Sequence, residues 1–430
     1  MNILIALIVF SIIIIIHELG HFLLAKKNGI GVTEFSVGMG PRIASFKKGE
    51  TRYSLKLLPF GGSCLMVGED ELVDADNAFN KKSVWARISV VVAGPIFNFI
   101  LAFLLALFII DNIGYDPAAI TKVEPNMGAY EAGLRVGDVI TEINGKNVDI
   151  SRDITNFYQF SQVTHAPVEI KYLRAGKKKT AKINPMKTKT YQMGFYYDPT
   201  DMPAQIVQVG EKTPFDTAGI KAGDIITKVD NQEIASGNEL NEYFSSNPLS
   251  EASVLVTYER EGETNTAKVT PKFIEESYKL GFGYNVGREK TSPLGVIKYS
   301  AIEVKYWIVT TVKSLEQMVM GRVSKDDIAG PVGIVNIIGD TYEESRQEGT
   351  LMVLLNLANI SILLSANLGV MNLLPIPALD GGRLLFLILE VFRGKPVDQE
   401  KEGLVHMIGL IALMILMVFI MFNDISRLFH

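Results

Sequence analysis

The first 25 residues form an apolar run that contains three ionisable side chains. The segment from Ile12 to Ala25 reads IIIIIHELGHFLLA, and His17, Glu18 and His21 are the only ionisable side chains before Lys26. At about 1.5 Å rise per residue, one helix of this length spans the roughly 30 Å hydrocarbon core of a bilayer. An isolated charge there costs about 2.5 kcal/mol or more, so we expect these groups to be functional.

The spacing of the two histidines indicates a metal site. On a helix, His17 and His21 are i, i+4 neighbours on one side, so both imidazoles can bind one ion, with Glu18 beside them to act on a bound water. Such a site still needs a third ligand. A polar contact between helices and a chance HExxH pattern are the alternatives.

The composition indicates a chain that lies partly in lipid. The 430 residues are 48% hydrophobic, and the mean hydropathy of +0.21 is too high for an ordinary soluble enzyme. The 21% of charged residues is too high for a chain wholly in lipid. The net charge of −5 comes without a basic block, so we expect no nucleic-acid partner. The single cysteine, Cys64, excludes an internal disulfide.

Four segments are long and apolar enough to span a membrane. They are Ile3 to Ala25, Ser89 to Ile110, Leu351 to Leu374 and Leu404 to Phe422. Ten Lys and Arg residues lie between positions 26 and 87, whereas no side chain before His17 is charged. The positive-inside rule therefore predicts an extracytoplasmic N-terminus and a cytoplasmic first loop. His17 then lies about 24 Å along the first span, in the cytoplasmic third of the bilayer.

Polar residues in the later spans predict further parts of a site. Asn98 in the second span must face the bundle or water, and a contact between helices is the simplest role for it. The third span ends in NLLPIPALDGG, residues 372 to 382, whose two prolines break the helix and leave Asp380 on a turn. Asp380 is a candidate third ligand, because two histidines and a carboxylate form a catalytic zinc site. The same ligands accept other divalent ions.

The segment between spans two and three contains a repeat. The sequence AGLRVGDVIT at 132 to 141 returns as AGIKAGDIIT at 218 to 227, and YQMGF at 191 to 195 returns as YKLGF at 278 to 282. Alternating apolar runs between them predict two small α+β modules. The AGxxxGDxIT pattern resembles PDZ domains, which bind extended peptides at a sheet edge. Steric spacers without a ligand are the alternative.

The motifs together resemble the site-2 protease family of intramembrane zinc metalloproteases. HELGH in a first span and NLLPIPALDGG after a later one carry this resemblance, and the tandem PDZ-like insertion is similar to the bacterial regulator-of-sigma-E protease branch. The resemblance implies that His17, His21 and Asp380 bind zinc and that Glu18 is the catalytic acid/base. It also implies that Asn372 assists substrate or oxyanion binding.

Two shorter motifs extend the resemblance to substrate binding. Gly94-Pro95-x-x-Asn98 looks like the second-span motif of the family, and Pro59-Phe-Gly-Gly62 is similar to its membrane-dipping hairpin, which holds a substrate as an added strand. Gly61, Gly62 and Asn98 are therefore predicted to contact substrate. Ser63-Cys64-Leu65 replaces the usual Tyr-Val-Lys, which bears on substrate preference.

We therefore expect a multi-pass α-helical membrane protein with about four transmembrane helices and two inserted α+β PDZ-like domains. The expected division is 1–111 (two spans and the hairpin loop), 112–197 and 198–290 (PDZ-like domains), 291–350 (amphipathic helical connector) and 351–430 (two spans). Residues 293 to 321 are expected to lie at the outer membrane interface or to pack against the second module.

The resemblance also implies the substrates and the compartment. Family members in the bacterial cytoplasmic membrane cut single-pass proteins whose outer domain is already trimmed, such as anti-sigma factors and signal-peptide remnants. The PDZ-like pair is then a size filter, and free peptide C-termini are possible ligands of it.

Two other classes of protein remain open on the sequence. A non-enzymatic membrane scaffold would use the PDZ-like pair for binding, and a transporter or metal-handling membrane protein would use His17, His21 and Asp380 as ligands. Neither class needs Glu18, which favours the protease. His165, His406 and His430 fit none of these schemes and are interpreted as structural or surface residues.

Overall fold

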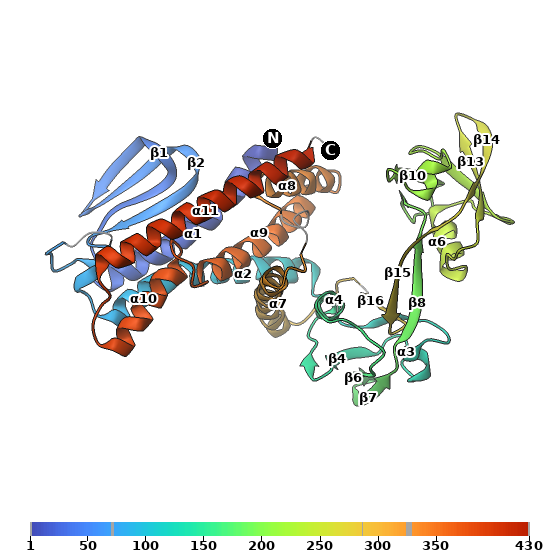
Figure 1. Cartoon of the computed structure of the whole chain (residues 1–430), viewed down its shortest axis with the longest axis horizontal. Helices are drawn as coiled ribbons and strands as arrows, with labels where there is room; N and C mark the ends of the chain where they lie inside the picture. The colour runs from blue at the N-terminus through green and yellow to red at the C-terminus, as the bar shows by residue number, and fades with distance from the viewer. Residues whose placement is uncertain (1, 70–72, 286, 324–328, 429–430) are drawn as a thin grey trace. The chain divides into compact units, whose positions relative to one another are not determined.

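The computed structural model describes residues 2–69, 73–285, 287–323 and 329–428 (Figure 1). The chain divides into two compact units. Unit 1 comprises Met1–Pro117 and Gly287–His430, and unit 2 comprises Ala118–Val286. Each unit is described by itself.

Long helices make up most of unit 1. The described helices are α1 (Asn2–Lys27), α2 (Val84–Ile113), α7 (Pro293–Val319), α8 (Pro331–Arg346), α9 (Thr350–Asn372), α10 (Asp380–Arg393) and α11 (Gln399–Leu428), with a short 3-10 helix at Phe79–Lys81. Four segments are long and apolar enough to cross a membrane: Ile3–Lys27, Val84–Ile113, Thr350–Leu373 and Glu400–Ser426. The four predicted spans are confirmed by length and composition.

The second helix starts earlier than the predicted span. It begins at Val84 rather than Ser89, because the hydroxyl of Ser83 accepts the backbone N–H of Ala86 and caps the helix. An apolar run marks the part of a helix that suits lipid, whereas the cap marks where the helix begins.

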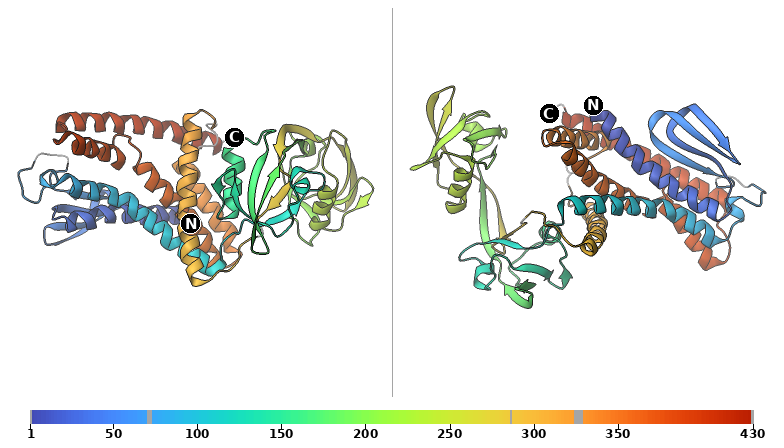
Figure 2. Two further views of the ribbon diagram at one scale, coloured as in Figure 1. Left: turned by 90° about the horizontal axis from the view of Figure 1, so that it is seen from below. Right: turned by 180° about the vertical axis from the view of Figure 1, so that it is seen from behind.

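Helix α2 is the centre of unit 1, with α1, α7, α9 and α10 packed against it (Figures 1 and 2). Ala102 and Ala106 are fully buried one turn apart, and they let α9 approach closely. The segment predicted to lie at the outer membrane interface or against the second module forms α7, which packs on α2 and α9. Its Glu303 is buried and accepts a hydrogen bond from the indole N–H of Trp307 at 3.0 Å.

The first loop folds into a small sheet beside α1. Strands β1 (Val32–Lys48) and β2 (Thr51–Met66) pair in a folded-over register, so that Ser36 pairs both with Ser54 and with Ser63. Residues 34–37 therefore lie between residues 52–55 and residues 62–65. Within the described part of the chain, residues 62–66 pair on one side only and form an edge of this sheet.

A buried carboxylate fixes the middle of this sheet. Glu34 accepts hydrogen bonds from Arg42 Nε at 2.7 Å and from the Ser54 hydroxyl at 2.6 Å. The hydrogen bond from Arg42 lowers the pKa of Glu34 to about 2, against the opposing effect of burial. The pairing keeps this charge ionised inside a small sheet.

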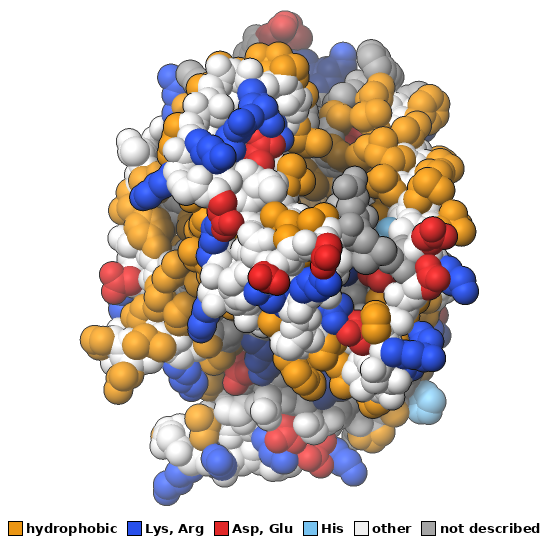
Figure 3. All heavy atoms as spheres, turned by 90° about the vertical axis from the view of Figure 1, so that its left-hand side faces the viewer, with side chains coloured by type: hydrophobic (Ala, Val, Ile, Leu, Met, Phe, Trp, Pro, Cys, Tyr) orange, Lys and Arg blue, Asp and Glu red, His pale blue; other side chains and the backbone are white. Residues whose placement is uncertain are grey.

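The outer surface of the sheet is both apolar and basic. Ile43, Phe46 and Leu57 are more than half exposed. Lys and Arg side chains are numerous among apolar ones at the end of the unit that carries this sheet and α10 (Figure 3). The exposed cations there include Lys47, Lys48, Arg52, Arg393 and Lys395.

Unit 2 contains two α+β modules with the same order of elements. The first has β3 (Ile120–Val123), α3 (Gly128–Glu131), β4 (Val139–Ile143), β5 (Lys146–Asn147), α4 (Ser151–Phe160), β6 (Val168–Arg174) and β7 (Lys177–Ile183). The second has β10 (Ala204–Val209), α5 (Pro214–Thr217), β11 (Ile225–Val229), β12 (Gln232–Glu233), α6 (Gly237–Ser246), β13 (Val254–Arg260) and β14 (Glu263–Val269). The sequence repeat is therefore a repeat of structure.

The remaining strands connect the modules and do not follow the expected division at residue 197. Strands β8 (Met186–Gln192) and β15 (Lys272–Lys279) form a two-stranded ribbon. Strand β9 (Phe195–Tyr197), expected in the first module, pairs with β10 of the second. Strand β16 (Phe282–Tyr284), which follows the second module, pairs with β3 of the first. A repeat reveals that two copies exist, but it does not reveal which copy each linking strand completes.

Candidate metal centre

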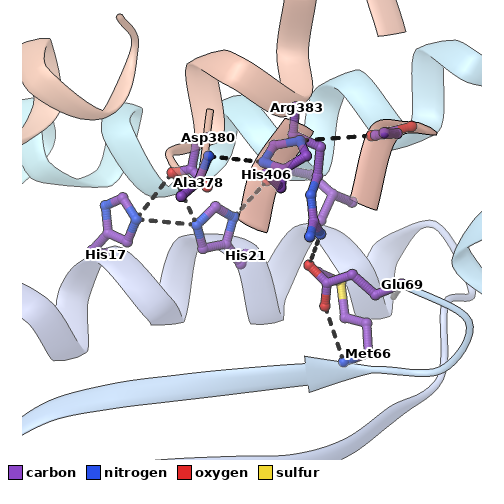
Figure 4. A network of polar contacts seen from close by, with 10 residues as sticks. His17, His21, Met66, Glu69, Ala378, Asp380, Arg383 and His406 are labelled. Atoms are coloured by element: carbon purple, nitrogen blue, oxygen red, sulfur yellow. Dashed lines mark hydrogen bonds and ion pairs between the residues drawn. The ribbon is translucent and has the colours of Figure 1, made fainter. Parts of the chain in front are cut away.

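Helix α1 presents two buried imidazoles to one point. His17 and His21 are 7% and 8% exposed, and their Nε2 atoms lie 3.1 Å apart (Figure 4). Their ring centroids are 4.8 Å apart with the planes at 79°. The predicted i, i+4 geometry is thus present, with both Nε2 atoms on the same side of the helix.

The turn after α9 brings a carboxylate to the same point. Asp380 is the first residue of α10, and its Oδ2 lies 3.1 Å from His17 Nε2 and 3.4 Å from His21 Nε2. The three ligand atoms lie within 4.8 Å of one another. Residues more than 350 positions apart in the sequence are therefore brought together by the packing of α1 and α10 on α2.

This cluster fits a zinc ion. His21 Nδ1 lies 2.9 Å from the carbonyl oxygen of Val90, so this nitrogen carries the proton and Nε2 has a free lone pair. Two such lone pairs facing each other and a carboxylate repel unless a cation lies between them. Two imidazoles and one carboxylate are also a common ligand set of catalytic zinc, which keeps a fourth position for water.

Asn98 of α2 lies behind His17. Its Nδ2 is 3.1 Å from His17 Nδ1, and its Oδ1 has no hydrogen-bond partner among the described residues, although the side chain is completely buried. Turning the amide by 180° places Oδ1 where it accepts the Nδ1–H of His17. This contact favours a role in orienting His17 over the expected contact with substrate.

The side of α1 that carries His17 and His21 lies directly against α2. A Cβ on Gly94 would come within 2.3 Å of His21 Nε2 and 2.7 Å of His17 Cε1. No larger residue fits there without moving both imidazoles. The GPxxN motif thus places Gly94 against the two rings and Asn98 behind one of them.

The edge of the first-loop sheet lies beside the candidate acid/base. A Cβ on Gly62 would be 3.3 Å from Cγ of Glu18, so the edge segment 62–66 passes next to this glutamate. Gly61 has φ +84°, a conformation suited to glycine. Asn372 is the last residue of α9 and is half-buried.

The comparison with protein families decides the assignment. Residues 5–416 match the profile of Peptidase family M50. The chain belongs to this family. The expected site-2 protease resemblance is therefore confirmed, and this M50 protein is a zinc metalloprotease with membrane-spanning helices.

Curated relatives match over almost their whole length. Zinc metalloprotease RasP of Shouchella clausii is 32% identical, with both chains covered completely. The Regulator of sigma-W protease RasP of Bacillus subtilis is 32% identical over 98% of each chain. Zinc metalloprotease RasP of Geobacillus kaustophilus is 31% identical, over 98% of this chain and 97% of its own. The M50 chain thus has the same overall extent as these proteases.

Among solved structures, the HtrA3 PDZ domain bound to a phage-derived ligand is similar to part of the M50 chain. It covers 21% of this chain and 93% of its own, with a TM-score of 0.18 and 19% identity.

Sequence reasoning missed several residues around the M50 metal centre. Arg383 of α10 forms an ion pair with Glu69 (Figure 4). At the other end of α10, Glu390 forms an ion pair with Arg87 of α2. His406 of α11 accepts the backbone N–H of Ala378 at 2.8 Å. The sequence does carry a signal for these contacts: ionisable residues lie at the ends of apolar segments, and such residues are usually paired.

Proposed function

We propose that this M50 protein cleaves peptide bonds within or near the transmembrane segments of single-pass membrane proteins. In this proposal His17, His21 and Asp380 hold the zinc ion and Glu18 is the catalytic acid/base. The observation that carries it is the convergence of the three ligand atoms beside Glu18, among helices apolar enough to lie in a bilayer.

The chemistry follows from the residues around this point. Zinc, when bound, lowers the pKa of a water ligand to about 7 and polarises a carbonyl oxygen. Glu18 takes a proton from the attacking water and returns it to the leaving amine. Asn372 donates a hydrogen bond to the developing oxyanion, and Asn98 keeps His17 in the tautomer that has Nε2 free.

The sheet edge supplies a way to hold an extended substrate. The amides of a transmembrane helix are hidden by their own hydrogen bonds, so the helix must unwind before it is cut. Among the described residues, positions 62–66 have a strand partner on one side only, and Gly62 lies beside Glu18. This supports their binding the unwound segment as an added strand, with Gly61 and Gly62 at its start. The exposed apolar side chains of the sheet favour its contact with lipid.

The proposed substrates are anti-sigma factors and signal-peptide remnants whose outer domain has already been trimmed. The Bacillus subtilis relative is named Regulator of sigma-W protease RasP, which supports the first class. The two PDZ-like modules would exclude substrates with a bulky outer domain and could bind the free C-termini that trimming creates.

The proposed orientation in a bacterial cytoplasmic membrane has the N-terminus and both modules outside. The exposed Lys and Arg side chains at the end that carries the sheet and α10 support a cytoplasmic position for that end. The metal cluster then lies near the cytoplasmic side.

The first experiment compares the wild type with Glu18→Gln on a trimmed single-pass reporter in membranes, with zinc content measured on both purified proteins. A Glu18→Gln variant that keeps its zinc but cleaves at least about a hundredfold more slowly supports Glu18 as the acid/base. Equal cleavage by both proteins would refute that role.

A second experiment tests the size filter. The same reporter is presented with and without a folded outer domain of about 100 residues, a typical domain size. The proposal expects cleavage of the trimmed form alone. Equal rates for both forms would remove the modules from substrate selection.

A further inference from the structure

Helix α11 has few contacts with the rest of unit 1. Only 6% of its most apolar window is buried. One of its described contacts, in the first third of the helix, is with the turn that precedes Asp380, and another, near its C-terminal end, is with α8. The first contact lies directly next to the metal centre (Figure 4).

The turn before Asp380 has an unfavourable backbone conformation. Ala378 has φ +76°, in the left-handed region that residues with a Cβ rarely adopt. Such a conformation persists only where the surrounding structure imposes it. Ala378 is two residues before Asp380. A contact that holds the Ala378 peptide in this conformation therefore also sets the direction from which the Asp380 carboxylate approaches the imidazoles.

His406 of α11 makes the contact that fixes this peptide. Its Nδ1 accepts the backbone N–H of Ala378 at 2.8 Å, and its ring lies 5.7 Å from that of Phe386 on α10. The accepting Nδ1 places the ring proton on Nε2, which points toward Glu402 Oε1 at 3.9 Å. The imidazole therefore joins α11 to both the turn and the helix that carries Asp380.

A second residue of α11, one turn from His406, packs on the same turn. A Cβ on Gly409 would lie 2.4 Å from Cβ of Pro377 and 2.6 Å from its carbonyl oxygen. His406 and Gly409 are i, i+3 neighbours on one face of α11. This face therefore matches the shape of the turn at Pro377 and Ala378.

The far end of α11 is also fixed. The buried carboxylate of Asp424 accepts the backbone N–H groups of Gly330 and Gly333 at 3.0 and 2.9 Å, at the start of α8. With one contact at the turn and one at α8, the helix is held at two points of unit 1.

We propose that His406 is a positioning residue of the metal centre, which acts through the Ala378 peptide to set the geometry of Asp380. Helix α11 is then the element that keeps the third ligand in place, although it contributes no ligand itself. The inference rests on the proposed role of Asp380 as a zinc ligand.

The test measures how tightly the full-length purified protein retains zinc in competition with a chelator, together with reporter cleavage in membranes. His406→Leu removes the acceptor, whereas His406→Asn keeps an acceptor oxygen near the position of Nδ1. Leucine is expected to weaken zinc retention about tenfold, as for other residues that orient metal ligands, and asparagine to restore most of it. Met407→Leu, at an exposed neighbour on the same helix, is the matched control and is expected to retain zinc like the wild type.

Four outcomes separate the possibilities. Equal zinc retention by His406→Leu and the wild type would overturn the inference, as would equal losses in the leucine and asparagine variants. Asp380→Asn serves as the reference for the ligand itself. If Asp380→Asn also retained zinc like the wild type, the proposed ligand role would fail first, whereas a zinc loss confined to Asp380→Asn would reject the role of His406 alone.

Discussion

The carboxylate of Glu69 pairs with the guanidinium of Arg383, three residues after Asp380 on α10. Glu69 follows the edge strand of the first-loop sheet, and its second oxygen lies 3.4 Å from the backbone nitrogen of Met66 at the end of that strand. One ion pair thus joins the segment proposed to hold the substrate to the helix that carries Asp380, the proposed third ligand.

Breaking this pair is expected to slow cleavage. In Glu69→Gln, Arg383 loses a partner in a half-buried position, so the sheet edge and α10 are no longer held together. Cleavage of the reporter should fall about tenfold or more, because a hydrogen bond to a charged group contributes about 1.5 kcal/mol or more. Reporter cleavage at equal membrane expression is the measurement.

A charge swap controls for general damage. Glu69→Arg combined with Arg383→Glu can restore the attraction with its direction reversed, so the double variant should cleave faster than either single one. If the effects of the two changes simply multiply, the residues act independently and the coupling is absent.

Gly94→Ala is expected to remove zinc. The new methyl carbon would lie 2.3 Å from His21 Nε2 and 2.7 Å from His17 Cε1, so both imidazole rings would have to move. Alanine normally favours a helix over glycine by about 1 kcal/mol, so a loss must come from the clash. Zinc content and cleavage should both fall. Gly403→Ala on α11, where no atom of the described structure lies within 4 Å of the new Cβ, should leave both unchanged.

The role of Asn98 is tested by its effect on metal affinity. Asn98→Leu removes the amide that faces His17 Nδ1, and loss of such an outer partner typically weakens metal binding about 10- to 100-fold. If Asn98 instead contacts substrate, the KM for the reporter would rise while zinc affinity stayed constant. Chelator competition and reporter kinetics on one preparation distinguish the two results.

The local parts of the centre could be predicted from sequence because they depend on helix periodicity alone. His17, Glu18 and His21 lie within five consecutive residues, and any α-helix puts the two histidines on one side. Asp380 could be nominated because two prolines end the preceding helix at a recognisable place. The spans followed from apolar length, which is also a local property.

The contacts that arrange the centre could not be predicted in this way. His406 and Ala378 are 28 residues apart, and Glu69 and Arg383 are 314 apart. Each pairing depends on how helices pack, which a single sequence does not encode in any spacing. The pairing of β9 and β16 with the opposite module could not be predicted either. In the sequence, each of these strands looks like the last strand of the module that it follows.

The two modules of unit 2 carry an equivalent ion pair, which predicts how each responds to pH. Arg174 bonds Asp138, and Arg260 bonds Asp224, each at 2.7 Å, and the same guanidinium also donates to the carbonyl oxygen of Gly133 or Gly219. Burial alone would raise the pKa of Asp138, but the hydrogen bonds from Arg174 and from the Arg135 N–H outweigh it and lower that pKa.

The sign of the pH effect follows from this lowered pKa. A carboxyl with a lower pKa in the folded than in the unfolded state stabilises the fold above its unfolded pKa of about 3.9, and this contribution is lost as the pH falls further. The wild-type first module should therefore lose stability below about pH 4. In Arg174→Met the buried Asp138 has no guanidinium partner, so the deficit relative to the wild type should be large at pH 7 and should shrink toward pH 4.

Hydrogen exchange of the full-length protein measures this deficit. Amides of β4 and β6 should exchange about tenfold or more faster in Arg174→Met at pH 7, after correction for the intrinsic rate at each pH, because breaking a buried pair destabilises the fold. Lys171→Met on the same strand removes the partly exposed pair with Glu142 and should change exchange little. Amides of β11 and β13 in the other module, which keeps its own Arg260–Asp224 pair, provide the internal reference. Equal acceleration in both modules would mean that they unfold as one cooperative unit, as the shared strands β9 and β16 permit, and the pair in one module would then stabilise both.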